Sequence, residues 1–199
     1  MCSSDLTSSV AGAYAFTNLA PGSYFAGFTP PAGHLFTTAN AGADATDSDV
    51  LSGTNRTALV TLVSGQAETT VDAGFYRPAS LGDFTWVDAN GNGQQDGGEI
   101  GLSNVVVTLY NAASNAVGTR TTSVAGAYAF TNLAPGVYFA GFAPPAGYVF
   151  ATADAGDDAT DSDAVSGTGF TALRTLASGQ TDATVDAGFV RPAAIGNFT

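Results

Sequence analysis

The chain repeats the stretch Ser9-Val-Ala-Gly-Ala-Tyr-Ala-Phe-Thr-Asn-Leu-Ala-Pro-Gly22 letter for letter as Ser123 to Gly136. The offset of 114 residues holds without a gap over positions 9–85, where most residues match their counterparts. Self-similarity at a fixed period is typical of tandem modules. The sequence therefore predicts a non-repeat leader at 1–6, a truncated first module at 7–78, a complete module at 79–192 and the first strand of a third module at 195–199.

The complete module reads as a series of short strands. β-branched and aromatic residues gather in the runs 81–87, 105–110, 127–131, 137–142, 170–176 and 184–190, which is typical of strands. The segment Asn132-Leu-Ala-Pro-Gly136 has the residues of a turn, so we expect 127–131 and 137–142 to form a hairpin. No run shows a helical period. The pattern predicts an all-β protein made of tandem antiparallel β-sandwich modules.

The excess of acidic over basic residues limits the kinds of partner that the protein can bind. The chain has 17 acidic residues against 5 basic ones, a formal net charge of −12, and every basic residue is an arginine. This balance argues against nucleic acid and anionic membrane surfaces as partners, and no apolar run is long enough for membrane insertion. The single cysteine, Cys2, excludes an intrachain disulfide. The acids either solvate the surface or bind cations.

One acidic segment fits a calcium-binding template. The segment Asp88-Ala-Asn-Gly-Asn-Gly-Gln-Gln-Asp-Gly-Gly-Glu99 fills the ligand positions 1, 3, 5, 7, 9 and 12 of the twelve-residue loop, with Gly93 at position 6 for the sharp turn. Oxygen donors without imidazole or thiolate favour Ca²⁺. The alternative is an Asn- and Gly-rich turn between two strands. The predicted ligands of this first site are Asp88, Asn90, Asn92, Gln94, Asp96 and Glu99.

A second acidic cluster lies at 154–163 and has a counterpart in the first module. The Asp-x-x-Asp-x-Asp pattern is common to both copies, and unpaired carboxylates packed together repel one another. We therefore expect a second Ca²⁺ site in each module, and the alternative is a solvated acidic loop. The candidate ligands are Asp158, Asp161, Asp163 and Asp186 in the complete module, and Asp44, Asp47, Asp49 and Asp72 in the first one.

The order of these segments resembles a known family. The stretch from Gly126 to Phe142 resembles the G-x-Y-x-F-x-x-L-x-P-G-x-Y signature of the B domains of serine-aspartate repeat surface proteins, and the segments 81–102 and 185–189 strengthen the likeness. These domains are a branch of the collagen-adhesin B-type, prealbumin-like sandwiches. The resemblance implies an Ig-like, calcium-binding module of an extracellular bacterial adhesin or stalk. Because the chain has no lysine, the Lys–Asn crosslink of some relatives is excluded.

These observations indicate a non-enzymatic structural repeat. We expect calcium to stabilise modules that contact their neighbours along the same chain, outside the cell or at its surface. The alternative is a ligand-binding module for a host or matrix protein or a glycan, or an accessory domain of a secreted hydrolase. Such binding would use exposed positions that differ between the copies, such as Asn55-Arg56 against Gly169-Phe170 and His34 against Tyr148.

Overall fold

The fold was obtained as a computed structural model, which describes residues 6–196. The chain forms two compact units: unit 1 is Met1–Ala32 with Phe36–Phe75, and unit 2 is Gly33–Leu35 with Tyr76–Thr199. Most of the expected leader and most of the expected third-module strand lie outside the described residues. Within residues 6–196, no helix is long and apolar enough to cross a membrane.

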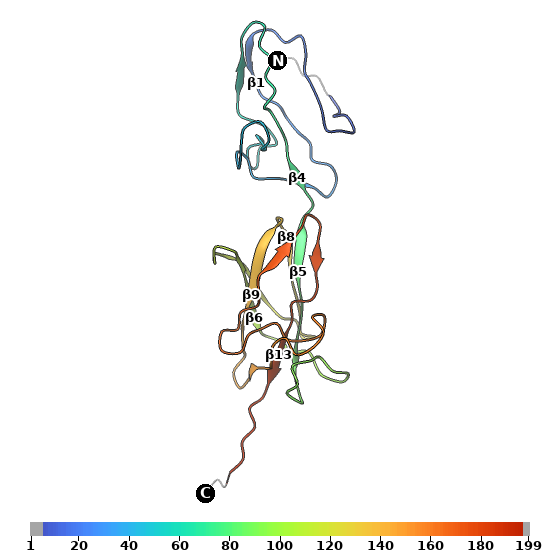
Figure 1. Cartoon of the computed structure of the whole chain (residues 1–199), viewed down its shortest axis with the longest axis vertical. Coiled ribbons are helices and arrows are strands. Elements are labelled where there is room, and N and C mark those ends of the chain that lie inside the picture. The colour runs from blue at the N-terminus through green and yellow to red at the C-terminus, as the bar shows by residue number, and fades with distance from the viewer. Residues whose placement is uncertain (1–5, 197–199) are drawn as a thin grey trace. The chain divides into compact units, whose positions relative to one another are not determined.

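Unit 2 contains two sheets built from short strands (Figure 1). In one sheet the order is β10-β13-β5-β12, with β8 also paired to β5; in the other it is β11-β9-β6-β7. The strands are β5 (Ala79–Val87), β6 (Val106–Asn111), β7 (Ala116–Thr121), β8 (Ala127–Leu133), β9 (Gly136–Ala143), β10 (Val149–Phe150), β11 (Arg174–Leu176), β12 (Thr181–Asp182) and β13 (Ala187–Val190). The all-β prediction is confirmed.

The first sheet is mixed rather than purely antiparallel, because β12 and β13 run parallel to β5. Parallel neighbours need a long crossover connection, and here most of the module lies between β5 and its parallel partners. The local strand patterns could not show this pairing, since they carry no information on which strands meet.

The core of unit 2 lies between the two sheets. Val105, Val107 and Leu109 are each 0% exposed, as their alternation in the sequence predicts. They pack with Tyr128 and Phe130 from β8 in the other sheet. Full burial of such side chains contributes roughly 1.5–3 kcal/mol each to the stability of the fold. Val87 at the end of β5 and Phe150 at the end of β10 pack against this core. The acidic loops at 88–99 and 154–163 follow these two strands.

The predicted hairpin of 127–131 with 137–142 is wrong. β8 pairs with β5 and β9 pairs with β6, so the intervening turn carries the chain from one sheet to the other. The reason is that both strands present aromatic residues to the same core: Tyr128 and Phe142 meet edge to face with ring centroids 5.6 Å apart. Two strands of one hairpin would place these rings on one face, whereas facing sheets place them opposite each other.

Unit 1 has fewer paired strands. In it β1 (Gly22–Tyr24) pairs with β3 (Val60–Leu62). The strands β2 (Leu35–Phe36) and β4 (Phe75–Tyr76) pair with each other at the residues where the division into units falls. No described strand of unit 1 corresponds to β5, β6 or β7 of unit 2. The apolar side chains are consequently less covered: Phe16 is 40% exposed, whereas its counterpart Phe130 is 3% exposed.

Candidate metal centre

The loop at 88–99 begins where β5 ends, and Asp88 anchors it. The Asp88 side chain is 2% exposed, and its backbone N–H donates to the carbonyl of Phe189 at 2.9 Å. Its Oδ1 accepts from Gly91 N at 2.7 Å and its Oδ2 from Gly93 N at 2.8 Å. Position 1 of the template is therefore a buried carboxylate around which the first half of the loop turns.

Four other predicted ligands, Asn90, Asn92, Asp96 and Glu99, are linked by hydrogen bonds within the loop. Asn90 and Asn92 each donate an Nδ2–H to Asp96 Oδ2 at 2.8 Å. Glu99 accepts from Ala89 N through Oε1 at 2.8 Å and from Asp96 N through Oε2 at 3.0 Å. Glu99 thus joins the two ends of the loop, which is the closing role that the template gives to position 12.

Gln94 differs from the other predicted ligands. Its side-chain Nε2 donates to the carbonyl of Ala155 at 2.9 Å, so this amide contacts the second acidic loop. The template uses a backbone carbonyl at position 7, and that requirement leaves the Gln94 side chain free for this contact. Gly93, at position 6, has the left-handed φ of 80° that the turn requires.

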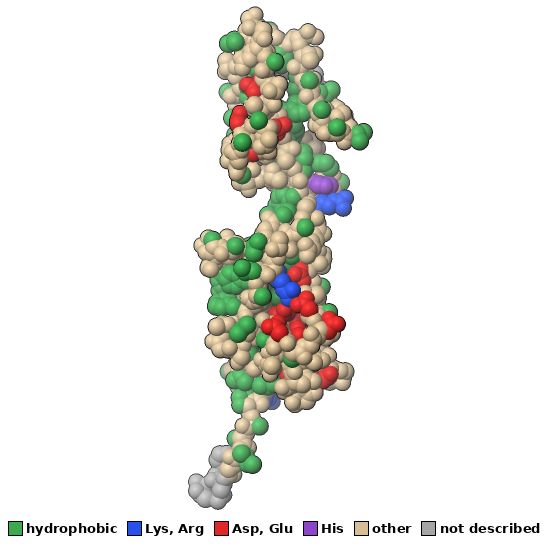
Figure 2. Space-filling model, viewed as in Figure 1, with side chains coloured by type: hydrophobic (Ala, Val, Ile, Leu, Met, Phe, Trp, Pro, Cys, Tyr) green, Lys and Arg blue, Asp and Glu red, His purple; other side chains and the backbone are tan. Residues whose placement is uncertain are grey.

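The structure brings the two acidic loops of unit 2 together. Gln94 and Asp161 form an antiparallel bridge, Gln95 N donates to Thr160 O at 2.7 Å, and Ser162 N donates to Gly93 O at 3.0 Å. Side chains of Asp and Glu gather on the face of unit 2 seen in Figure 2, with a basic side chain beside them. The sequence predicted two separate sites and missed this contact, since nothing local records it.

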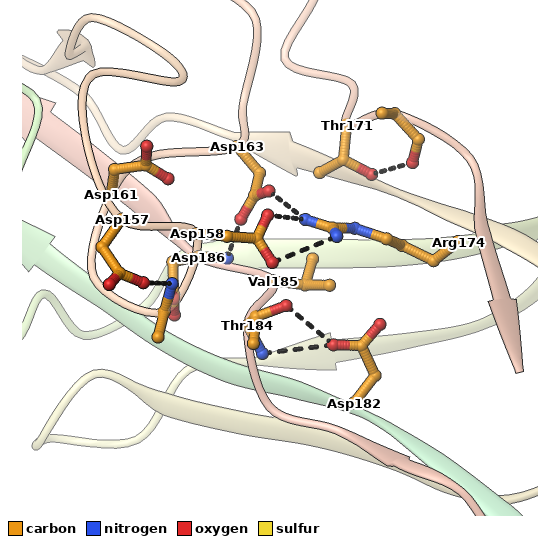
Figure 3. Close-up of polar contacts among 12 residues, drawn as sticks. Asp157, Asp158, Asp161, Asp163, Thr171, Arg174, Asp182, Thr184, Val185 and Asp186 are labelled. Carbon is orange, nitrogen blue, oxygen red and sulfur yellow. Dashed lines mark hydrogen bonds and ion pairs between the residues drawn. The ribbon is translucent and has the colours of Figure 1, made fainter.

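Arg174 neutralises part of the second acidic cluster (Figure 3). Its Nη2 lies 2.7 Å from Asp158 Oδ1 and 2.5 Å from Asp163 Oδ1. The guanidinium hydrogen bonds lower the pKa of the exposed Asp158 carboxyl. Asp163 is 4% exposed, and its burial outweighs the ion pair and raises its pKa to about 6. A cation from the chain itself therefore lies where a metal ion was expected.

Two further predicted ligands are buried in the loop framework. Asp161 accepts from Gly156 N through Oδ2 at 2.8 Å. Asp186 accepts from Phe84 N through Oδ1 at 3.0 Å, while its Oδ2 is buried without a hydrogen-bond partner. Burial, with added repulsion from Asp83, raises the pKa of Asp186 to about 8. These carboxyls hold backbone groups in place, and Asp186 retains one oxygen that no group satisfies.

Unit 1 repeats this framework without the arginine. Asp49 Oδ2 accepts from Asp72 N at 2.7 Å, and Asp163 Oδ2 accepts from Asp186 N at the same distance. Asp47 Oδ2 accepts from Gly42 N at 2.8 Å, while Asp44 is exposed. The position of Arg174 is occupied by Val60. This difference between the copies was a sequence signal that could have identified Arg174 as part of the cluster.

Carboxylates alone do not form a metal cage in this structure. Among residues 6–196, no group of three or more His, Cys, Asp and Glu side chains is placed to hold a metal ion. The loop at 88–99 also offers amide and carbonyl oxygens, which calcium accepts as readily as carboxylates. Its donor set is all oxygen, and its glycine and glutamate occupy the places that the template requires, so the residues present fit a calcium ion.

The two-sheet fold and the repeated acidic loops define a class of small β-sandwich repeat modules. A family model described as "SdrD B-like domain" matches residues 2–75 and 79–189. The chain belongs to this family, as the sequence resemblance indicated, and it is accordingly a non-enzymatic B-repeat region of the type found in serine-aspartate repeat surface proteins.

The relatives found in comparisons are much longer than the chain. The chain is 38% identical over 182 residues to serine-aspartate repeat-containing protein F of Staphylococcus epidermidis, a match that covers 90% of the chain and 10% of that protein. It is 41% identical over 155 residues to serine-aspartate repeat-containing protein C of Staphylococcus aureus, covering 76% of the chain and 16% of that protein. The chain thus spans a small part of these relatives.

Solved structures give more distant matches. The Bacillus anthracis TIE protein matches with 16% identity and a TM-score of 0.43, covering 92% of the chain and 28% of that structure. GBS52, the minor pilin of Streptococcus agalactiae, matches with 14% identity and a TM-score of 0.42, covering 71% of the chain and 62% of that structure.

Proposed function

We propose that the chain is a calcium-stabilised structural repeat of a cell-surface adhesin. The observation that carries the proposal is the loop at 88–99, in which Asp88 is buried and Glu99 joins the two ends of the loop. The amides of Asn90 and Asn92 both donate to Asp96 within the same loop. The calcium ligands would be Asp88, Asn90, Asn92, Asp96, Glu99 and the carbonyl of Gln94. A bound ion would supply two positive charges among three carboxylates.

The expected role of calcium is stabilisation of unit 2. An ion that binds the folded but not the unfolded chain adds RT ln(1 + [Ca²⁺]/Kd) to the free energy of unfolding. At millimolar extracellular calcium, a site with Kd of about 10⁻⁴ M contributes about 1 to 1.5 kcal/mol. Since the loop is hydrogen-bonded to the loop at 154–163, an ion in the first loop also restrains the second. We infer that the chain acts as a spacer outside the cell or at its surface.

The second acidic cluster is proposed to behave differently in the two units. In unit 2, Arg174 already pairs with Asp158 and Asp163, so the need for a metal ion there is reduced. In unit 1 the corresponding acids are Asp44 and Asp49, and the repeat position of Arg174 holds Val60. We therefore place the stronger candidate for the second site in unit 1, with Asp47 and Asp72 as its remaining ligands.

The test uses the full chain and its single tryptophan. Trp86 is fully buried, 0% exposed, and precedes Asp88 by two residues, so its fluorescence reports on the folding of unit 2. Calcium titration by calorimetry and thermal melting with calcium or with EGTA should show binding and a higher melting midpoint with calcium.

Glutamate variants identify the site. Glu99→Gln should abolish most of the calcium effect, because the template needs both carboxylate oxygens at position 12. Glu68→Gln is the matched control, since Glu68 is the other glutamate of the chain and lies in unit 1. Absence of calorimetric binding, or an equal calcium effect in the two variants, would overturn the proposal.

A second candidate function is ligand binding by an aromatic cluster. Tyr110 and Phe139 stack with ring centroids 5.1 Å apart, and Phe170, which is 42% exposed, meets both rings edge to face. In unit 1 the counterpart of Phe170 is Arg56, which lies over Phe25 at 4.8 Å. Exposed rings are typical of glycan and protein contacts. Binding of a glycan or matrix protein by the chain, lost in Phe170→Arg, would support this function, and array screening without any binding would contradict it.

A further inference from the structure

The loop at 88–99 contains both Asn-Gly dipeptides of the chain, Asn90-Gly91 and Asn92-Gly93. Glycine has no side chain to hinder its backbone nitrogen, so this pair is the most reactive setting for an asparagine amide. We propose that Asn90 and Asn92 are sites of spontaneous deamidation, and that Asp88 and Asp96 set the rate at which it occurs. The modification needs no calcium and does not rest on the proposed function, but it changes two residues that the proposed function names as ligands.

The chemistry requires only the chain and water. The backbone nitrogen of the glycine loses its proton and attacks the side-chain Cγ of the preceding asparagine. A new N–Cγ bond forms, the Cγ–Nδ2 bond breaks, and ammonia leaves with the added proton, giving a five-membered succinimide. Water then opens the ring at either carbonyl, which yields aspartate or the β-linked isoaspartate. No oxidant, reductant or cofactor takes part.

Asp88 restrains the attacking nitrogens. Its two carboxylate oxygens accept from Gly91 N at 2.7 Å and from Gly93 N at 2.8 Å. A short hydrogen bond to a carboxylate that is 2% exposed is strong, because little water competes for it. Each nitrogen therefore keeps its proton, and its position is fixed toward Asp88 rather than toward the asparagine side chain.

Asp96 restrains the amides that would be attacked. Asn90 and Asn92 both donate Nδ2–H to Asp96 Oδ2 at 2.8 Å, while their Oδ1 atoms accept from Asn92 N at 3.0 Å and Gln94 N at 2.9 Å. The Cγ atoms are thus held between partners on both sides. Rotation toward the glycine nitrogen would break both of these hydrogen bonds.

The two sites are coupled through the shared acceptor. Deamidation of Asn90 removes an N–H donor and places a second carboxylate next to Asp96, which repels it. Asp96 then holds Asn92 less firmly, so the first event accelerates the second. An isoaspartate also adds a carbon to the backbone and destroys the alternate spacing of the ligand positions. The loop therefore carries a slow, irreversible change in both charge and shape.

The experiment follows deamidation by mass spectrometry of the full chain aged at neutral pH. Trypsin gives the peptide Thr57–Arg120, because Pro78 protects the bond after Arg77. This peptide also contains Asn104, Asn111 and Asn115 as internal controls. We expect slow modification confined to Asn90 and Asn92 in the wild type, and a several-fold faster rate at these two residues in Asp88→Ala.

Variants separate the proposal from simple unfolding. Trp86 fluorescence checks that each variant is folded, and the wild type in urea gives the unrestrained rate. Asp96→Ala leaves the Asp88 bonds in place and should also accelerate the reaction, while Glu68→Ala, at an exposed acid of unit 1, should not. If both loop variants age at the wild-type rate, or if modification is spread evenly over the five asparagines, the proposal is overturned. If Asp88→Ala is unfolded, Asp96→Ala alone decides.

Discussion

The contact between the two acidic loops can be tested by adding one methyl group at Gly93. A Cβ at this position would lie 2.3 Å from Thr152 O and 2.9 Å from Ala155 Cβ, and the backbone φ is 80°. Gly91 provides a matched control, since its φ is 76° and a Cβ there meets nothing within 4 Å. Both alanine variants incur the left-handed backbone cost of roughly 1–2 kcal/mol, and only Gly93→Ala also separates the loops.

The magnitude of the difference follows from the bonds that would be lost. The loops are joined by Gln95 N to Thr160 O, Ser162 N to Gly93 O and Gln94 Nε2 to Ala155 O. At roughly 0.5–1.5 kcal/mol for each net hydrogen bond, full separation costs about 1.5–4.5 kcal/mol. Because the loops can shift in part, we expect Gly93→Ala to be less stable than Gly91→Ala by about 2–3 kcal/mol.

The assay is urea unfolding of the full chain in EGTA, followed by Trp86 fluorescence. EGTA removes any contribution of calcium, so the two variants differ only in the steric effect of the methyl group. If their unfolding free energies agree within about 0.5 kcal/mol, which is the usual error of such comparisons, the loops are not packed as described and the reasoning is refuted.

Three further predictions concern charge and burial. Arg174→Val leaves Asp163 buried without its cation and should lower the unfolding free energy by about 3 kcal/mol at neutral pH. Urea unfolding should show a smaller loss of stability below pH 6, where Asp163 is protonated. An equal loss at both pH values would contradict the pairing of Arg174 with Asp163. The pKa of Asp186 is raised from 3.8 to about 8, so the folded chain binds this proton more tightly than the unfolded chain. Its contribution to stability is full below pH 3.8 and is lost as the pH rises through about 8; Asp186→Asn should flatten the decline in melting midpoint over this range, and an unchanged slope would argue against a buried acid. Amide exchange should be faster around Phe16 than around Phe130, since these repeat counterparts are 40% and 3% exposed, and equal protection would show that unit 1 has a core as well covered as that of unit 2.

The sequence by itself determined several of the strands and the residue types of the acidic loops, although β7 was not among its predicted runs. The alternation of Val105, Val107 and Leu109 is a local property, because successive side chains of a strand point to opposite faces, and all three are buried as predicted. The spacing of Asp88, Gly93 and Glu99 is likewise local, since a single turn of chain brings the ends of that loop together. The sequence also showed that the chain is a tandem repeat of a known family, because repeated stretches are recognised without knowing which residues are in contact.

Tertiary structure decided which of these elements meet. The turn after β8 resembles a hairpin turn, yet β8 pairs with β5 and β9 with β6, because aromatic residues of both strands are buried from opposite sides of one core. Arg174 and Asp158 are separated by sixteen residues, and their ion pair arises only when β11 joins β9. Charge attraction and hydrophobic burial depend on the distance between side chains in the folded structure. The local pattern of a sequence does not give that distance for residues far apart in the chain.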